Sequence, residues 1–354
     1  NYSNELWDKE VNRYSVNGIS YDLNGNIGTL NRRGLTGTIS TPAFGVMDDI
    51  IYAYSGDQLI NVTDEEIGSH PLDFADGNLH YTTGLDDYTY DNNGNLTKDR
   101  NKGITGITYN HLNLPQEVSK GATHKVEYLY DATGAKLQKT VTDGSTVTVT
   151  DYASIGNYTN GTLDFIFTGE CRAVDDNGSW RYEYYYKDHL GNTRLGFSDY
   201  DGNEEVDETE ITQQNNYYPF GLEHKGTDYG IATQTTHKYL FQKQELQDEL
   251  GLGGYSFRWR NSMPELGRFF NVDPLADKYV YNSVYAFSEN RLLDGVELEG
   301  LEFSSVIGED GKIEGVGKKV NKNNIPSREK VIDLKENYIF PGIVDMRVFV
   351  GEPG

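Results

Sequence analysis

The chain has 354 residues, enough for two or three domains of ordinary size. Its formal net charge of −24 argues against nucleic-acid binding by the scaffold, because phosphate groups would be repelled. One cysteine excludes an internal disulfide framework, and without a run of 18 apolar residues we expect no transmembrane helix.

Residues 1 to about 202 contain a repeated pattern. It reads aromatic, any residue, Tyr-Asp, two residues, Gly, any residue, then Leu or Ile, with successive copies about 20 residues apart. The clearest copies begin at Tyr21, Tyr90 and Tyr130, and weaker copies begin at Tyr54, Tyr109 and Tyr186. This spacing is typical of repeat architectures, in which small units stack to build one core.

Each copy predicts a strand followed by a tight turn. Tyr-x-Tyr places two rings on one face of a strand, and we expect their hydroxyl groups to reach water. The Asp accepts backbone N–H groups in the turn, and the Gly adopts a left-handed conformation. The sequence therefore predicts an all-β protein, less than about a tenth helix, with one curved, coiling antiparallel sheet from Tyr14 to Tyr200.

An acidic loop follows the repeats. Its side-chain oxygen donors have a spacing that partly matches a calcium-binding loop, and they are Asp199, Asp201, Asn203, Asp207 and Glu210. The glycine, Gly202, stands at the fourth position of this loop instead of the sixth, and no helices are expected around it. Two interpretations stay open, a weak Ca²⁺ site and a solvated acidic loop, and no other metal or cofactor site is expected.

The next block, residues 217–301, is dense in aromatic residues, and near Leu301 Tyr becomes scarce while Lys becomes common. Together with the repeats, this block resembles the Rhs and YD-repeat family, whose repeats end in an Rhs repeat-associated core. The segments that carry the resemblance are residues 182–197, 215–222, 238–261, 266–279 and 282–300. The resemblance implies a YD-repeat β-shell (1–200), an Rhs core that plugs it (201–301) and a separate C-terminal β segment (302–354).

The resemblance also implies a function, the enclosure and delivery of a C-terminal effector or toxin in bacterial antagonism. Many members release that effector by aspartyl autoproteolysis, which by motif position would use Arg268, Asp273 and Asp294 and cut between Leu298 and Glu302, near Leu301. The glycines expected after the Asp-Pro step are missing here, so two interpretations stay open. Either the core cleaves itself, or the two aspartates only cap turns.

The expected partners are the chain's own C-terminal effector, secretion-system components and an immunity protein. The expected location is outside the cell or at its surface, although no signal peptide is recognised and both ends have the character of fragment ends. The alternative from another class is a surface-displayed adhesive or carbohydrate-binding repeat protein with no releasable cargo.

The C-terminal tail, residues 330–354, resembles the start of a dihydroorotase-like cyclic amidohydrolase. That family binds metal through His-x-His after the strand aspartate, here Asp345. The matching positions hold Arg347 and Phe349, which are not metal ligands. We therefore expect a truncated passenger without catalysis, and a fusion to such a hydrolase is the second alternative.

Overall fold

The structure is a computed structural model that describes residues 13–38, 40–66, 74–76, 85–168, 171–176, 178–224 and 237–306. It is all-β, with antiparallel strands in open sheets, which confirms the predicted fold class. Helix in this part of the chain consists of short 3₁₀ turns: η2 (Glu208–Glu210), η3 (Phe241–Lys243), η4 (Glu249–Gly251), η5 (Ala276–Lys278) and η6 (Ser288–Asn290). No helix among these residues is long and apolar enough to cross a membrane.

Three sheets, which we call the wall, contain β1 to β17. The first has the order β1 (Val16–Tyr21), β2 (Ile27–Leu35), β3 (Phe44–Ser55), β4 (Gln58–Asp64), and the second pairs β5 (Tyr88–Tyr90) with β6 (Leu96–Asp99). The third has eleven strands in chain order: β7 (Gly106–Tyr109), β8 (Pro115–Ser119), β9 (His124–Tyr130), β10 (Lys136–Asp143), β11 (Thr146–Ala153), β12 (Gly156–Thr159), β13 (Thr162–Phe167), β14 (Cys171–Asp176), β15 (Ser179–Lys187), β16 (Thr193–Phe197) and β17 (Ile211–Gln214).

The prediction of one continuous sheet over residues 14–200 is wrong, because the described strands of this range form three sheets, with a break in the hydrogen-bond ladder on each side of β5–β6. At the first break, the backbone N–H of Val62 in β4 donates to the carboxylate of Asp87 at 2.9 Å. A side chain thus occupies a donor that a neighbouring strand would otherwise use.

At the second break the plug intervenes. The N–H of Leu96 in β6 donates to the carbonyl of Phe270 at 3.0 Å, and Phe270 belongs to the later part of the chain. The carbonyl of Leu96 accepts the hydroxyl of Tyr109 at 2.6 Å. Both backbone groups of Leu96 therefore have partners outside a strand ladder. Strands β6 and β7 are not paired, and an isolated bridge between Asp99 and Ile104 joins the end of β6 to the residues before β7.

The predicted turn chemistry is confirmed in the three clearest repeats. Asp22, Asp91 and Asp131 each accept the N–H groups of the residues two and four positions on, at 2.7–3.0 Å. The glycine three positions after each aspartate has a φ of 78–83°, a conformation that favours glycine. Each repeat thus closes its own turn from local residues alone.

The repeat tyrosines differ from the prediction that their hydroxyl groups reach water. The hydroxyl of Tyr54 donates to the carbonyl of Ile27 at 2.8 Å, as that of Tyr109 does to Leu96. Ile27 and Leu96 are the residues with which earlier repeats open their second strand. The tyrosines therefore link one repeat to the one before it, because a buried hydroxyl needs a partner.

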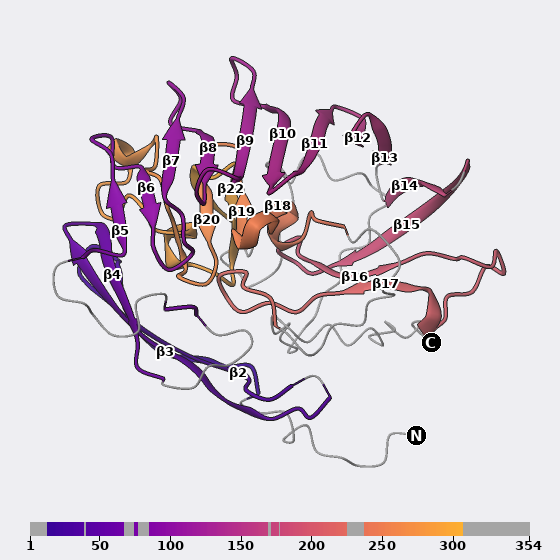
Figure 1. The fold of residues 1–354 in the computed structure, drawn as a ribbon. Coiled ribbons are helices and arrows are strands. Elements are labelled where there is room, and N and C mark those ends of the chain that lie inside the picture. Colours follow the sequence, from indigo (N-terminus) through magenta and orange to yellow (C-terminus); the bar gives the residue numbers. More distant parts are fainter. Residues whose placement is uncertain are drawn as a thin grey trace, which may run out of the picture.

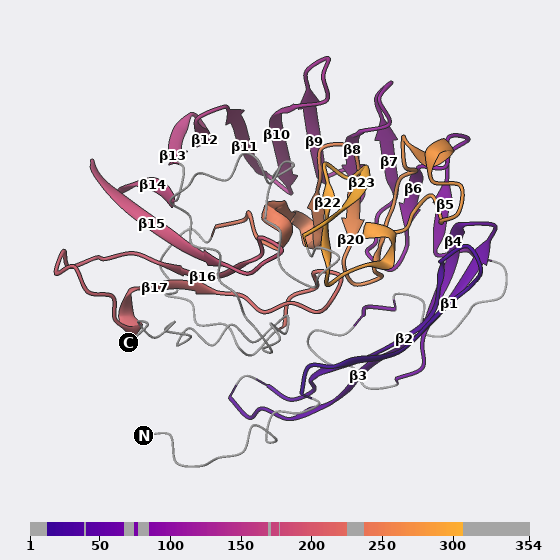
Figure 2. The same cartoon turned by 180° about the vertical axis from the view of Figure 1, so that it is seen from behind.

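The segment of residues 237–306, which we call the plug, lies inside the arc of the wall (Figures 1 and 2). Its strands form a four-stranded sheet and a separate hairpin: β18 (Glu245–Gln247), β19 (Gly254–Ser256), β20 (Asn261–Met263) and β21 (Arg268–Phe269), then β22 (Gly295–Leu298) and β23 (Glu302–Ser305). Residues far apart in the sequence therefore share one core.

Aromatic rings fill the centre of the plug. Phe257, Phe269 and Phe287 are at most 3% exposed, and their ring centroids lie 5.2–5.7 Å apart. They belong to the same core as wall residues such as Leu30 and Leu96. Burial of each ring contributes on the order of 2 kcal/mol, so the plug and the wall stabilise each other.

Buried cations also join the plug to the wall. The guanidinium of Arg32 in β2 forms an ion pair with Asp48 at 2.6 Å and donates to the carbonyl of Glu265 at 2.7 Å. Further along, the plug carboxylate of Glu245 lies 3.0 Å from the ammonium of Lys139 in β10.

Strand pairing continues past residue 301, the predicted end of the core. Strand β23 pairs with β22 up to Ser305, and Val306 is 2% exposed. The amidohydrolase-like tail and its residues Asp345, Arg347 and Phe349 lie outside the described residues.

Candidate functional site

A buried arginine stands at the centre of the plug's charged groups. Arg260 lies between β19 and β20, is 2% exposed, and stacks its guanidinium 3.9 Å from the ring centroid of Phe269. Its Nη2 atom lies 3.1 Å from Oδ2 of Asp273 and 3.1 Å from Oε1 of Glu297. Its Nε atom donates to the carbonyl of Gly300. One guanidinium thus joins two carboxylates and a backbone carbonyl.

The second oxygen of each carboxylate is held by a backbone N–H group. Oδ1 of Asp273 accepts from Leu275 at 2.7 Å, and Oε2 of Glu297 accepts from Ser288 at 2.8 Å. Asp273 follows β21, whereas Glu297 belongs to β22. Backbone N–H groups of the folded plug therefore hold both carboxylates in fixed orientations.

Burial raises the pKa of both carboxyl groups, although Arg260 opposes this rise. The negative charge of Asp273 raises the pKa of Glu297 further. Burial also lowers the pKa of Arg260, against the attraction of both carboxylates. Two acids that share one buried cation are therefore easier to protonate than exposed acids, which is a condition that acid–base chemistry needs.

A small cavity of about 20 Å³ adjoins this group, enough for about one water molecule. Its lining includes Arg260, Asp273 and Glu297 together with Leu301 and Glu302. The two acids and the stretch where the sequence predicts a cut therefore face the same space.

Arg268, the predicted arginine of the site, has other partners. Its Nη2 atom donates to the carbonyl of Asp57 at 2.8 Å. The guanidinium lies 5.1 Å from the ring centroid of Tyr54 and 4.8 Å from that of Tyr285. Arg268 thus ties the plug to the wall, and the ion pair to Asp273 comes from Arg260 instead.

Asp294, the predicted second acid, lies just before β22. It forms an ion pair with Arg291, and the two side chains are 37% and 49% exposed. Its carbonyl accepts the N–H of Val306 at 2.8 Å, which adds a hydrogen bond at the open end of the β22–β23 hairpin. No ion pair or hydrogen bond joins Arg268, Asp273 and Asp294 to one another. The acid next to Asp273 is Glu297, which sequence reasoning missed along with Arg260.

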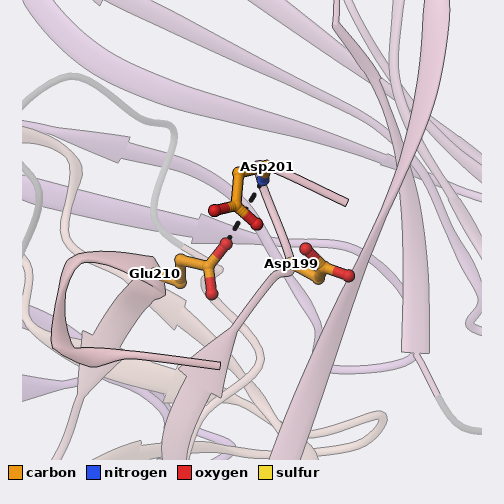
Figure 3. Close-up of side chains that lie close together, drawn as sticks. All are labelled: Asp199, Asp201 and Glu210. Carbon is orange, nitrogen blue, oxygen red and sulfur yellow. Dashed lines mark hydrogen bonds between the residues drawn. The ribbon is translucent and has the colours of Figure 1, made fainter. Parts of the chain in front are cut away.

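Three of the five calcium candidates come together. Ligand oxygens of Asp199, Asp201 and Glu210 lie within 4.8 Å of one another, and Glu210 is buried (Figure 3). Backbone groups already use the Glu210 carboxylate, because it accepts N–H groups from Tyr200 at 2.6 Å and from Asp207 at 3.2 Å. These bonds hold the Glu210 carboxylate in place within the loop.

The remaining two candidates serve turns. The side-chain oxygen of Asn203 accepts the N–H of Glu205 at 2.7 Å, and a carboxylate oxygen of Asp207 accepts the N–H of Thr209 at 2.7 Å. Asp207 also caps η2, the short turn that contains Glu210. A Ca²⁺ site here stays a prediction.

No protein-family model matches the chain. Its fold is an Rhs-like shell, similar to the solved structures of TcdB2-TccC3-Cdc42 and of TcdB2-TccC3. Each has a TM-score of 0.51 and 16% sequence identity, and the matches cover 80% and 77% of this chain and 15% of each solved chain.

One curated protein is also similar. The chain is 25% identical over 235 residues to Salivary gland surface protein 1 of Aedes aegypti, a match that covers 60% of this chain and 6% of that protein. The chain thus spans less than a fifth of the length of each of these relatives.

Proposed function

We propose that the chain is part of a shell that encloses and delivers a C-terminal effector outside the cell. The observation that carries the proposal is the plug, which lies inside the arc of the wall and shares a core with it. The shell-like fold, together with the resemblance of the repeats and core to Rhs proteins, supports the same function. The effector that follows the core, an immunity protein and the secretion machinery are the proposed partners.

Enclosure is tested by limited proteolysis of the complete protein. We expect the segment that follows the plug to resist protease while the wall is intact. It should be cut once the contact between wall and plug is weakened by Glu245→Gln. Digestion of that segment at the same rate in both proteins would contradict enclosure.

The proposal includes release by self-cleavage between Leu298 and Glu302. Motif position assigns the chemistry to Arg268, Asp273 and Asp294. Support comes from the cavity that Asp273 and Leu301 both line. The test is intact mass spectrometry of the freshly folded chain, in which we expect a C-terminal fragment that begins between residues 299 and 302. A single intact mass after prolonged incubation would reduce the aspartates to a structural role.

The rival function, a surface-displayed carbohydrate-binding or adhesive protein, is favoured by one strand. In β15 every second residue is an exposed aromatic, with exposed fractions of 42–56%: Trp180, Tyr182, Tyr184 and Tyr186. Such a row offers large, rigid contact area at one face of the sheet. The name of the mosquito relative also includes a surface location.

A glycan-binding assay separates the two functions. The rival function predicts binding to immobilised polysaccharide that is lost in the double variant Tyr182→Ala and Tyr184→Ala. Enclosure predicts no such binding, and an unchanged protease resistance in that variant.

A further inference from the structure

The carbonyl of Gly300 accepts a hydrogen bond from the buried arginine to which both plug carboxylates are paired. Arg260 donates to it from Nε, while Nη2 of the same guanidinium holds Asp273 and Glu297. The next residue, Leu301, lines the cavity that the two carboxylates also line. A cation on the carbonyl oxygen makes its carbon more electrophilic.

From this geometry we infer that the plug cuts the Gly300–Leu301 peptide bond, with Arg260 polarising the carbonyl and with Asp273 and Glu297 as the acid pair. The inference rests on the proposed self-cleavage and changes its residues. It replaces Arg268 by Arg260 and Asp294 by Glu297, and it moves the cut to one defined bond.

The backbone of Gly300 is shaped for this contact. Gly300 has a φ of +78°, and Glu299 before it has a φ of +55°, so the turn between β22 and β23 is left-handed at both positions. A Cβ atom on Gly300 would lie 2.9 Å from Cβ of Phe257 and 3.1 Å from the backbone N of Arg260. Only glycine lets the peptide approach the arginine this closely.

The hydrolytic step balances with one water molecule. A water in the cavity adds through its oxygen to the carbonyl carbon of Gly300, and its proton passes to the ionised member of the acid pair. Arg260 stabilises the oxyanion that forms. The C–N bond then breaks as the protonated member of the pair donates a proton to the nitrogen of Leu301. The products are a carboxyl group on Gly300 and an amino group on Leu301, and the pair again holds one proton.

The environment of the pair suits this exchange. Burial raises the pKa of both carboxyl groups, and each lies against the same single cation. Both directions favour the protonated acid, and the shared Arg260 brings the two carboxyl groups to one guanidinium. In contrast, Asp294 is paired with Arg291 at the surface.

The experiment follows cleavage of the full 354-residue chain by intact mass spectrometry during cell-free synthesis. For the wild type we expect a fragment that begins at Leu301. In water enriched in ¹⁸O, we expect one heavy oxygen in the carboxyl group of Gly300. Glu297→Gln should slow cleavage by about 100-fold or more, the usual contribution of a general acid or base. Arg260→Lys should slow it by about 100- to 1,000-fold, as loss of an oxyanion donor does.

The matched control is Glu299→Gln, which changes an exposed carboxylate in the same turn and should leave the rate unchanged. Glu297→Asp should recover part of the rate, which a purely structural glutamate would not predict. Each variant is compared at equal folded fraction, measured by circular dichroism and urea unfolding.

The outcomes separate the inference from the proposed function. Cleavage that survives Glu297→Gln but stops in Asp294→Asn would overturn the inference and leave self-cleavage standing. A fragment that begins at Glu302 would also overturn the assigned bond. A wild-type chain that folds and stays whole would overturn both this inference and the proposed self-cleavage.

Discussion

Two buried groups of charges hold the plug, and they treat their carboxylates in opposite ways. Glu245, where the plug meets the wall, lies 3.2 Å from Nζ of Lys136 and 3.0 Å from Nζ of Lys139. It also accepts the hydroxyl of Tyr152 at 2.7 Å. Burial alone would raise its pKa, but the two lysines and the tyrosine offset burial and lower the pKa to about 2.

Inside the plug the ratio of cations to carboxylates is reversed, since Arg260 alone pairs with both Asp273 and Glu297. Burial then prevails, and the pKa of each carboxyl group rises. The difference teaches that the number of cations beside a buried carboxylate decides whether that carboxylate stays charged or can take up a proton. A surplus of cations locks a carboxylate in its charged form as a structural tie, whereas a deficit leaves an acid able to exchange protons.

The largest effect is expected for Glu245→Gln. The change leaves Lys139 paired with Glu249 and removes the carboxylate with which Lys136 pairs, so we expect a loss of about 4 kcal/mol in the free energy of unfolding. Urea denaturation measures it. The control is Glu127→Gln, which removes an exposed partner of Lys125 and should leave the midpoint unchanged. Equal losses in both variants would mean that Glu245 is no stronger a structural tie than the exposed Glu127.

The effect of Glu245 should also depend on pH. Because its pKa is lower in the folded chain than its ordinary value of about 4.3, its stabilisation is complete above that value and is lost as pH falls through about 2. The shift corresponds to a contribution on the order of 3 kcal/mol. Urea unfolding of wild type and Glu245→Gln at pH 7, 4 and 2.5 should show their difference shrink. A difference that grows on acidification would contradict it.

The close approach of Gly300 to Arg260 is expected to have the next largest effect. Gly300→Ala forces a methyl group against Phe257 and Arg260 in a left-handed conformation. Gly144→Ala is the matched control, because Gly144 has a similar φ of +61° and open space around it. Both lose the glycine's freedom, so we expect Gly300→Ala to cost about 2 kcal/mol more than Gly144→Ala in urea unfolding. Equal costs would mean that the turn can move away from Arg260.

A smaller effect is expected for Glu297→Gln, which directly sharpens the contrast with Glu245. Arg260 keeps Asp273 as its counterion, and the glutamine can still accept one hydrogen bond from Arg260 or Ser288. We therefore expect a loss of about 1.5 kcal/mol in the free energy of unfolding. A loss as large as that of Glu245→Gln would show that both carboxylates are structural ties.

The smallest effect is expected for Asp294→Asn. Its ion pair with Arg291 is partly exposed, and its backbone carbonyl keeps the bond to Val306. We expect a change below about 0.5 kcal/mol in the free energy of unfolding. A loss above about 2 kcal/mol would mean that the Asp294 side chain stabilises the folded plug more than a partly exposed ion pair does.

What the sequence by itself determined is local. The turn of each repeat depends on an aspartate and a glycine three residues apart, as at Asp22 and Gly25, and both act within five residues. Alternating tyrosines fix the strands in the same way. Strand and turn identity could therefore be predicted, and so could the all-β class.

The division of the wall into three sheets could not be predicted. It depends on Asp87 reaching Val62 and on Phe270 reaching Leu96, contacts between residues far apart in the chain. The tyrosine hydroxyl bonds between repeats were missed for the same reason. Only the folded arrangement decides which backbone groups remain available for pairing.

The charged site was decided by tertiary structure most of all. In β22 the apolar residues Val296 and Leu298 alternate with Glu297, a pattern that predicts the glutamate outward. The structure instead buries Glu297, because the buried Arg260, from the turn between β19 and β20, is its counterion. Arg268 and Asp294 were assigned by their motif positions, yet spacing along a chain cannot say which cation a carboxylate meets. The folding of the plug decides it, because folding brings Asp273 and Glu297 to the guanidinium of Arg260.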